Sequence, residues 1–181
     1  MNTISIETER LILRELQLSD AEAMFELDSN PEVHKYLGNN PIYTIEQAIN
    51  VINMIRKQYA ENGIGRWATI EKSTGNFIGW SGLKFIQEYE NNHINFHDVG
   101  YRLMPKYWGK GYATESAKAA LKYGFTQMNL NEIIGSANVE NKASRNALEK
   151  CGLKFVEQFM WHDIKCDWLK ITREEWLRLV Q

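Results

Sequence analysis

The chain has 181 residues, of which 44% are hydrophobic and 24% charged, and its formal net charge is -2. This length suits one buried core rather than two, and the composition excludes disordered and collagen-like classes. The near-neutral charge gives no reason to expect a nucleic-acid partner, and no apolar run approaches the roughly eighteen residues of a membrane helix. We therefore expect one globular domain over residues 1–181, with neither a membrane nor a nucleic acid as its partner.

The first residues and the cysteines indicate in which cellular compartment the protein is expected. The stretch MNTISIETER lacks a basic start followed by an apolar core, so we expect no secretory signal peptide. Cys151 and Cys166 do not form a CxxC pair, which favours reduced thiols in a cytoplasmic protein. The histidines are scattered and make no zinc signature, so no metal is expected.

The N-terminal third predicts one strand and two helices. Residues 6–16 alternate roughly between apolar and polar side chains and predict a strand. Helices are expected over 21–29, with Ser19 as the N-cap, and over 45–61, with Thr44 as the N-cap of a capping box.

The rest of the chain predicts antiparallel strands followed by strand–helix units. Strands are expected over 66–71, 77–86, 96–104, 132–139, 154–160 and 165–171, and helices over 111–128, 141–152 and 172–180. Short strands with turn-rich connections favour an antiparallel meander, whereas strand, glycine turn, helix and strand over 96–139 favour a parallel pair. The order predicts a mixed α/β (α+β) fold, with a mostly antiparallel central sheet of about six to seven strands flanked by helices.

Gly109 and Gly111 stand one residue apart at the start of the helix expected over 111–128. The first turn of a helix has backbone N–H groups without intrahelical partners and carries the positive end of the helix dipole. Glycine has no Cβ, so a bulky anion can approach the main chain closely, and Lys106 and Lys110 add positive charge. The sequence therefore predicts a phosphate site at this turn.

Two common phosphate-binding motifs do not fit this turn. The P-loop pattern GxxxxGK[ST] is absent, and the pattern GxGxxG fails because Thr114 stands at the third glycine. Glu132 lies about twenty residues on, but it precedes its strand, whereas the ribose-binding acid of a dinucleotide fold should follow it. A dinucleotide-binding oxidoreductase is therefore an alternative prediction. The position of Glu132 and the antiparallel strands expected before the glycine turn both argue against it.

The stretch VGYRLMPKYWGKGYATESAKAAL resembles the acyl-CoA pyrophosphate motif of the GNAT N-acetyltransferases. NVENKASRNALEKCGLKFV resembles the helix and strand that follow this motif in the branch that includes the ribosomal-protein alanine/serine acetyltransferases, and TERLILREL with DAEAMFEL resembles its opening strand and helix. The resemblance covers nearly the whole chain. It implies the GNAT-like acyl-CoA N-acyltransferase fold, a splayed parallel pair of strands at the CoA site, and acetyl-CoA as the cosubstrate.

The resemblance also implies which residues hold coenzyme A. The backbone of the glycine turn would hold the pyrophosphate, and its residues are Trp108, Gly109, Lys110, Gly111, Tyr112, Ala113 and Thr114. The pantetheine arm would pair with the strand that ends at Leu103 and Met104, as an added strand does. Asn138 and Asn141 would hold the pantetheine amides. Lys106 stands where the family usually has Arg or Gln, so it supplies charge without the fork geometry of arginine.

Acetyl transfer needs a neutral amine, a donor for the developing oxyanion, and a proton or hydrogen bond for the leaving thiolate. The resemblance implies direct attack in a ternary complex, which needs no nucleophilic cysteine. The candidates for the base are Asp98, Glu88 and His97, and some family members use a carboxylate at the place of Asp98 through water. The alternative for Asp98 is an ion pair with a nearby Lys or Arg. The backbone N–H near Leu103 or Met104 is expected to meet the oxyanion.

Ser144, in the NxxS helix, is the candidate acid, and its alternative role is to cap the helix N-terminus. Many family members outside this branch use a tyrosine about one turn later, where this chain has Glu149. Trp67, Trp80 and Tyr101 lie on the central strands and are candidates for the acceptor pocket, although core packing is the more ordinary role of such residues.

Together these features predict an acetyl-CoA-dependent N-acetyltransferase that acts on a primary amine. The amine could belong to a protein N-terminus, such as that of a ribosomal protein, or to a small molecule such as a polyamine, an antibiotic or an amino-acid-like metabolite. A CoA-binding sensor or scaffold without catalysis is the alternative that the residues leave open. Dimers are common in the family, so the resemblance also leaves a homodimer open.

Overall fold

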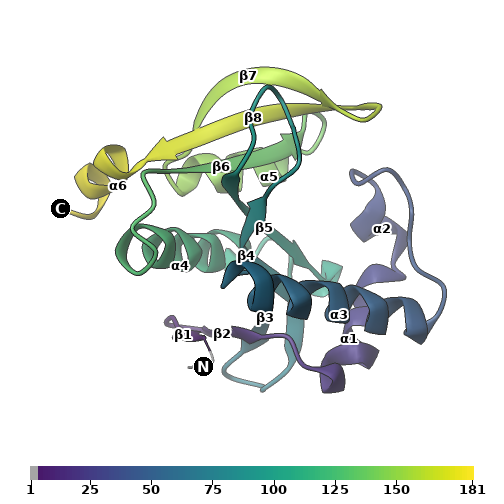
Figure 1. Cartoon of the computed structure of the whole chain (residues 1–181). Helices are drawn as coiled ribbons and strands as arrows, with labels where there is room; N and C mark the ends of the chain where they lie inside the picture. Colours follow the sequence, from purple (N-terminus) through teal and green to yellow (C-terminus); the bar gives the residue numbers. More distant parts are fainter. Residues whose placement is uncertain (1–3) are drawn as a thin grey trace.

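The structure, a computed structural model, describes residues 4–181. Its strands form one eight-stranded sheet in the order β1-β2-β3-β4-β5-β6-β8-β7 (Figure 1). The strands are β1 (Ser5–Glu7), β2 (Leu11–Glu15), β3 (Arg66–Glu71), β4 (Phe77–Ile86), β5 (Phe96–Leu103), β6 (Glu132–Asn138), β7 (Lys154–Trp161) and β8 (Ile164–Thr172). The helices are α1 (Ala21–Asp28), α2 (Pro31–His34), α3 (Ile45–Asn62), α4 (Tyr112–Thr126), α5 (Lys142–Lys150) and α6 (Arg173–Val180), with 3-10 turns η1 (Leu18–Asp20) and η2 (Pro105–Tyr107). The mixed, mostly antiparallel fold is confirmed, but the sheet has eight strands rather than six or seven.

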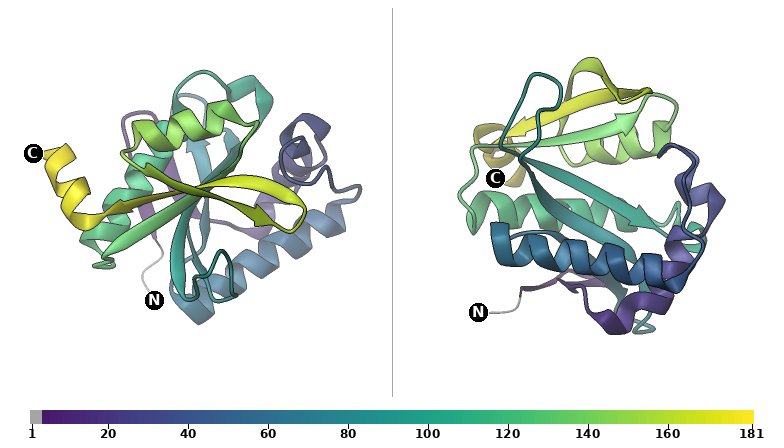
Figure 2. Two further views of the ribbon diagram at one scale, coloured as in Figure 1. Left: turned by 90° about the horizontal axis from the view of Figure 1, so that it is seen from above. Right: turned by 45° about the vertical axis from the view of Figure 1, so that its right-hand side comes forward.

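Helices cover both faces of the sheet. On one face, Leu121 of α4 and Leu148 of α5 are buried together with Val99 of β5. On the other face, α1 and α3 pack over a second core that includes Leu27 and Ile52. Figure 2, right, shows α3 in front of the sheet and α4 behind it. Successive side chains of β5 therefore point by turns toward α4 and α5, or toward α1 and α3.

The strand expected over 6–16 is in fact two strands. β1 and β2 pair antiparallel, with Ser5 opposite Arg14. Thr8 closes the turn between them, because its N–H donates to the Leu11 carbonyl and its hydroxyl oxygen accepts from the Leu11 N–H, both at 2.9 Å. The apolar alternation continues through this turn, so periodicity alone does not reveal the reversal.

The helix starts are partly as the sequence predicts. Thr44 caps α3 in a capping box with Gln47, and Gly63 ends that helix with a φ of 68°. The expectation that Ser19 caps α1 is wrong, because η1 precedes the helix and places Asp20 at its N-cap position.

β5 and β6 run parallel, as the strand–turn–helix–strand order predicts. Among the described residues, their register contains one pair, Asp98 with Ile134. Figure 2, right, shows the two strands leaving a common point and diverging. A splayed pair is therefore present beside the glycine turn. Across residues 4–181, no helix combines the length and the apolar character that a membrane span requires.

The C-terminal helix α6 offers a test of stability. The Thr172 hydroxyl accepts from the Glu175 N–H at 3.3 Å, and the Glu175 carboxylate accepts from the Thr172 N–H at 2.9 Å. Lys154 donates to the same carboxylate at 2.7 Å, and this bond, with those from Thr172, lowers the pKa of Glu175 to about 2. We expect Glu175→Gln to lower the free energy of unfolding by about 1 kcal/mol at pH 7, measured by urea denaturation.

The loss should depend on pH. Because the folded-state pKa of Glu175 lies below its ordinary value of 4.5, its contribution is complete above pH 4.5 and is lost as the pH falls toward 2. The variant should therefore approach the wild type in stability over that range. Glu174→Gln is the control, because Glu174 is exposed and meets Arg178 at 3.8 Å. An equal loss in both variants would contradict the capping role.

Candidate active site

The glycine turn between η2 and α4 has a backbone suited to an anion. Gly109 and Gly111 have φ of 73° and 83°, a region that residues with a side chain rarely adopt. A Cβ on Gly109 would meet nothing within 4 Å, so the space in front of it is open. The Glu115 N–H donates to the Gly111 carbonyl at 3.0 Å as the first bond of α4. The amides of Tyr112 to Thr114 come before that bond and lack intrahelical partners, so they can meet a phosphate.

The two lysines of this region differ in what they can add. Lys106 lies in η2, and its ammonium donates to Glu26 of α1 at 3.0 Å. Lys106 and Glu26 are both exposed, so this is a surface ion pair, and the role of the Lys106 charge at the turn stays a prediction. Lys110 lies within the turn, with its ammonium 5.3 Å from the centre of the Tyr107 ring.

β5 presents a free edge where it diverges from β6. The Met104 N–H donates to the Ile78 carbonyl of β4 at 2.9 Å, so Met104 is not available as the expected oxyanion donor. Amides alternate in direction along a strand, so the N–H groups of Leu103 and Tyr101 point toward the gap with β6. The Leu103 carbonyl already accepts from the indole N–H of Trp108 at 2.7 Å. Of the two predicted donors, Leu103 is the one whose N–H faces the gap.

Tyr101 connects β5 to the start of α5. Its hydroxyl donates to the Ser144 carbonyl at 2.8 Å and lies 3.2 Å from Ser144 Oγ. Burial raises the pKa of Tyr101, so the hydroxyl keeps its proton. Asn141 caps α5 by accepting from the Ser144 N–H at 3.1 Å, and Asn138 accepts from the Glu140 N–H at 2.9 Å. The side-chain oxygens of both asparagines are therefore engaged, and their N–H groups remain as donors for a ligand.

Asp98 lies on the face of β5 that α1 and α3 cover. Its carboxylate forms an ion pair with Arg66, and its carbonyl accepts from Arg66 Nη1 at 2.7 Å. Burial raises the pKa of Asp98, and the positive charge of Arg66 works against that rise. His97 points to the opposite face and packs against Phe85, with ring centres 4.9 Å apart and ring planes tilted by 35°. The ion pair that the sequence left open for Asp98 is present, and Arg66 offsets part of the rise in the pKa of Asp98 that burial causes.

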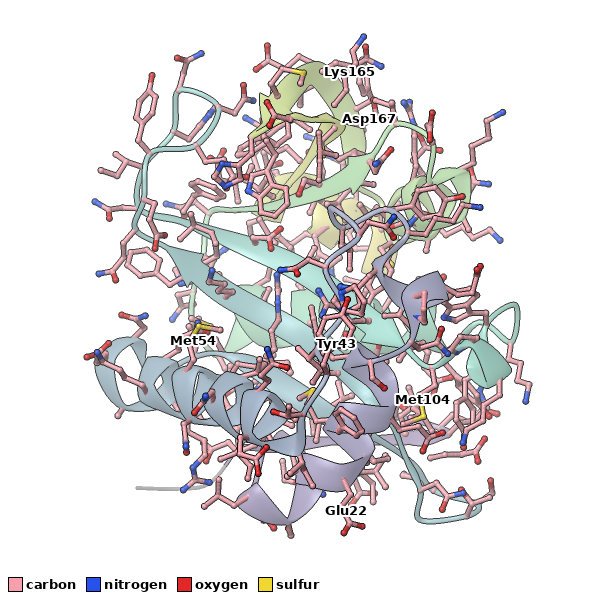
Figure 3. All side chains as sticks on the ribbon, turned by 90° about the vertical axis from the view of Figure 1, so that its right-hand side faces the viewer. Glu22, Tyr43, Met54, Met104, Lys165 and Asp167 are labelled. Carbon is pink, nitrogen blue, oxygen red and sulfur yellow. The ribbon has the colours of Figure 1, made fainter. Side chains whose placement is uncertain are left out.

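A second ion pair lies on the same face, beside Trp80. Arg102 of β5 donates to Asp28 of α1 at 2.7 Å. The centre of the Trp80 ring lies 5.6 Å from the guanidinium of Arg66 and 5.0 Å from that of Arg102. Figure 3 looks toward this face, with α3 below it, β6 and β8 above it, and Tyr43 of the α2–α3 loop toward the viewer.

Trp67 does not belong to an acceptor site. It has no exposed surface, and its ring packs edge-on against Tyr123 of α4 with centres 5.3 Å apart. Arg66 and Ala68 point to the other face, because side chains alternate along a strand. The prediction that Trp67 binds substrate is therefore wrong. Tyr101 is also turned away from the face of Trp80, which leaves Trp80 as the aromatic candidate for the acceptor.

The thiols are not activated. Cys151 and Cys166 are buried and free, and burial raises the pKa of each to about 11. The Cys151 thiol donates to the Thr114 carbonyl at 3.5 Å. A thiol that stays protonated near neutral pH is a poor nucleophile, so neither cysteine suits a covalent mechanism.

Arg10, between β1 and β2, contacts the glycine turn, and the sequence reasoning did not anticipate this contact. Its Nη1 donates to the Lys110 carbonyl at 2.9 Å, and its Nε donates to Glu115 at 2.7 Å. The sequence did contain a signal. Glu115 places a negative charge in the first turn of a helix that is expected to bind an anion. This charge would repel the anion, so a positively charged partner for Glu115 is expected.

The geometry fits a ligand that joins a pyrophosphate to an extended arm bearing amides, as coenzyme A does. The turn supplies amides without partners and open space at Gly109. The free edge of β5 begins at Leu103, next to the turn, and an extended arm can pair with such an edge as an added strand does.

Comparison with known proteins identifies the family. The family model "Acetyltransferase (GNAT) domain" matches residues 10–154. Uncharacterized N-acetyltransferase p20 of Bacillus licheniformis is 35% identical over 159 residues, which cover 88% of this chain and 86% of that protein. FsC-acetyl coenzyme A-N(2)-transacetylase of Aspergillus fumigatus is 33% identical over 97% of this chain and 79% of that protein. Spermidine N(1)-acetyltransferase of Vibrio cholerae is 28% identical over 82% of this chain and 80% of that protein.

A solved structure agrees with these relatives. An acetyltransferase (GNAT family) from Bacillus anthracis has a TM-score of 0.77 and 30% identity, covering 94% of this chain and 99% of that one. The antiparallel pairing from β1 to β5 also removes the dinucleotide-fold alternative. The chain therefore belongs to the GNAT acetyltransferase family and is an N-acetyltransferase.

Proposed function

We propose that this N-acetyltransferase moves the acetyl group of acetyl-CoA to an α-amine, such as that of a protein N-terminus, by direct attack in a ternary complex. The observation that carries the proposal is the glycine turn, with open space at Gly109, placed next to the free edge of β5 at Leu103. Acetyl-CoA supplies the acetyl group and the thiolate that leaves. The chain supplies binding, orientation and hydrogen bonds. A ribosomal protein, as in the branch that the sequence resembles, is one acceptor of this chemical class.

The candidate base and the candidate acid lie on opposite faces of β5. The amine would approach on the face of α1 and α3, where Asp98 would take its proton through water. Ser144 and Tyr101 lie on the other face, with their hydroxyl oxygens 3.2 Å apart. There the Ser144 hydroxyl would donate a hydrogen bond to the leaving thiolate. The Leu103 N–H would meet the developing oxyanion. The nitrogen loses one proton and the sulfur gains one, so the reaction balances without a further reactant.

The ion pairs favour an acceptor whose amine has a low pKa. Asp98 is held by Arg66, and Asp28 by Arg102, so neither carboxylate is free to attract a polycation. The ordinary pKa is about 7.7–8.0 for an α-amine and about 10.4 for a lysine-like alkylamine. At pH 7.5 about one third of the α-amine is neutral, against about one part in a thousand of the alkylamine. An α-amine therefore needs far less help from a base that is already ion-paired.

A panel of acceptors at saturating acetyl-CoA tests the proposal. At pH 7.5 we expect kcat/KM for a short peptide with an N-terminal alanine or serine to exceed that for spermidine by about 100-fold or more. Release of free thiol and the mass of the product measure the transfer. The same peptide with a blocked N-terminus and an added lysine is the control for side-chain amines. Faster turnover of spermidine would contradict the acceptor class, and no acetylated product with any amine would contradict the reaction.

A further inference from the structure

Arg10 joins the opening of the chain to the glycine turn, which follows 100 residues later at Lys110. The backbone N–H of Arg10 donates to Glu115 at 2.9 Å, and its Nε and Nη2 lie 2.7 Å from the same carboxylate. Its Nη1 donates to the Lys110 carbonyl at 2.9 Å. One guanidinium thus holds residues on both sides of Gly111. We call this group of contacts the Arg10–Glu115 clamp.

The clamp sets the direction of an amide in the turn. The C=O and N–H of a trans peptide point in opposite directions. Because Arg10 binds the Lys110 carbonyl, the N–H of Gly111 points away from Arg10. The guanidinium also lies 4.4 Å from the centre of the Tyr112 ring, and a Cβ on Gly111 would meet Arg10 Nη2 at 3.4 Å. The guanidinium therefore lies close to the turn, and the positive φ of Gly111, 83°, is what favours glycine at this position.

The clamp also neutralises a charge in an unfavourable place for an anion site. Burial works to raise the pKa of Glu115, but hydrogen bonds from Thr8 and Arg10 outweigh it and lower the pKa, so the carboxylate is ionised at neutral pH. Without a partner, this charge in the first turn of α4 would repel a pyrophosphate and occupy the positive end of the helix dipole. The Glu115 side chain is 17% exposed, whereas that of Arg10 is 42% exposed, so positive charge remains accessible beside the turn.

We infer that Arg10 is a positioning residue for the pyrophosphate of coenzyme A, because it neutralises Glu115 and fixes the Lys110 carbonyl so that the turn presents its amides to the ligand. The inference rests on the proposed function. Arg10 lies in the stretch TERLILREL, which contains none of the residues proposed for acetyl transfer. The inference gives this stretch a role in binding coenzyme A.

The test measures binding of coenzyme A to the full chain by calorimetry, together with steady-state kinetics. Arg10→Ala should raise the Kd for coenzyme A about 10- to 100-fold, the loss typical of hydrogen bonds to a charged group. It should raise KM for acetyl-CoA and leave kcat at saturation nearly unchanged. It should also leave kcat/KM for acetyl-pantetheine, which lacks the pyrophosphate, at the wild-type value. Arg10→Ala combined with Glu115→Gln should recover much of the affinity, because the unpaired charge is gone.

Arg14→Ala is the matched control for a general loss of stability. Arg14 lies on β2 and forms a comparable pair with Asp20, with two N–H···O contacts of 2.8 Å. It should lower the free energy of unfolding without changing the Kd for coenzyme A. Wild-type affinity in Arg10→Ala, an equal loss in Arg14→Ala, or no recovery in the double variant would overturn the inference. If the wild-type chain bound no coenzyme A, the proposed function would fall and the inference with it.

Discussion

Gly109→Glu should abolish binding of coenzyme A in a chain that still folds. The glycine has a φ of 73° and open space in front of it, so a glutamate there would enter the room for the pyrophosphate and add a negative charge. Losing two charge-assisted hydrogen bonds, at about 1.5 kcal/mol each, corresponds to a loss of affinity of about 100-fold or more. Calorimetric titration with coenzyme A measures this loss.

Gly63→Glu separates the effect on the ligand from backbone strain. Gly63 ends α3 with a φ of 68°, and a Cβ there would also meet nothing within 4 Å. Each variant places a side chain in left-handed backbone, at a cost of about 1–2 kcal/mol, so both should lower the free energy of unfolding by similar amounts. The loss of coenzyme A should be confined to Gly109→Glu. Unchanged affinity in that variant, or an equal loss in both, would refute the glycine turn as the pyrophosphate site.

Arg66→Met should destabilise the fold by about 3–5 kcal/mol, measured by urea denaturation. Arg66 is 8% exposed and reaches from β3 to β4 and β5, where it donates to the carbonyl of Gly82 and pairs with Asp98. Gly100 leaves room for it, since a Cβ there would meet Arg66 Nη2 at 2.7 Å. Removal of the arginine leaves the largely buried Asp98, whose side chain is 17% exposed, without its partner, which is the costly way to break an ion pair.

The double variant Arg66→Met with Asp98→Leu is the control for that loss. Replacing both partners by apolar residues removes the unpaired charge, so most of the lost stability should return. A loss below about 1 kcal/mol in Arg66→Met would be typical of an exposed pair and would contradict the burial of this one. A double variant no more stable than Arg66→Met would contradict the unpaired charge as the cause.

Most elements of the fold could be predicted because their signals are local. The capping box at Thr44 and the glycine at position 63 set the ends of α3, and the order of elements over 96–139 was enough for the parallel pair. The reversal between β1 and β2 could not be predicted. Residues 8–10 contain neither glycine nor proline, and the turn depends on bonds between Thr8 and Leu11.

The glycine turn could be predicted because its chemistry lies in the backbone next to two glycines. The partners of the candidate catalytic residues could not, since they come from distant parts of the chain. Arg66 lies 32 residues from Asp98, and Tyr101 lies 43 residues from Ser144. The separation of two residues along the sequence does not predict whether they are in contact. These contacts depend on the register of the strands.

Register also explains why Trp67 does not reach the face on which Trp80 lies. Trp67 and Trp80 both lie on central strands and look alike in the sequence. The pairing of β3 with β4 sets Trp67 opposite Ser81 and Trp80 opposite Ala68, so the two indoles point to opposite faces. The register of β3 against β4 therefore decides which of the two indoles is buried under α4.

Thermal unfolding of the full chain with and without acetyl-CoA, and with NADH as a second phosphate-bearing ligand, tests most directly whether the glycine turn holds acetyl-CoA. At 100 times its Kd, acetyl-CoA should stabilise the fold by about 2.7 kcal/mol. For a chain of this length that corresponds to a rise in Tm of about 5–10 °C, and NADH should give no comparable rise. No rise with acetyl-CoA, or a rise with NADH alone, would contradict the assignment of the site.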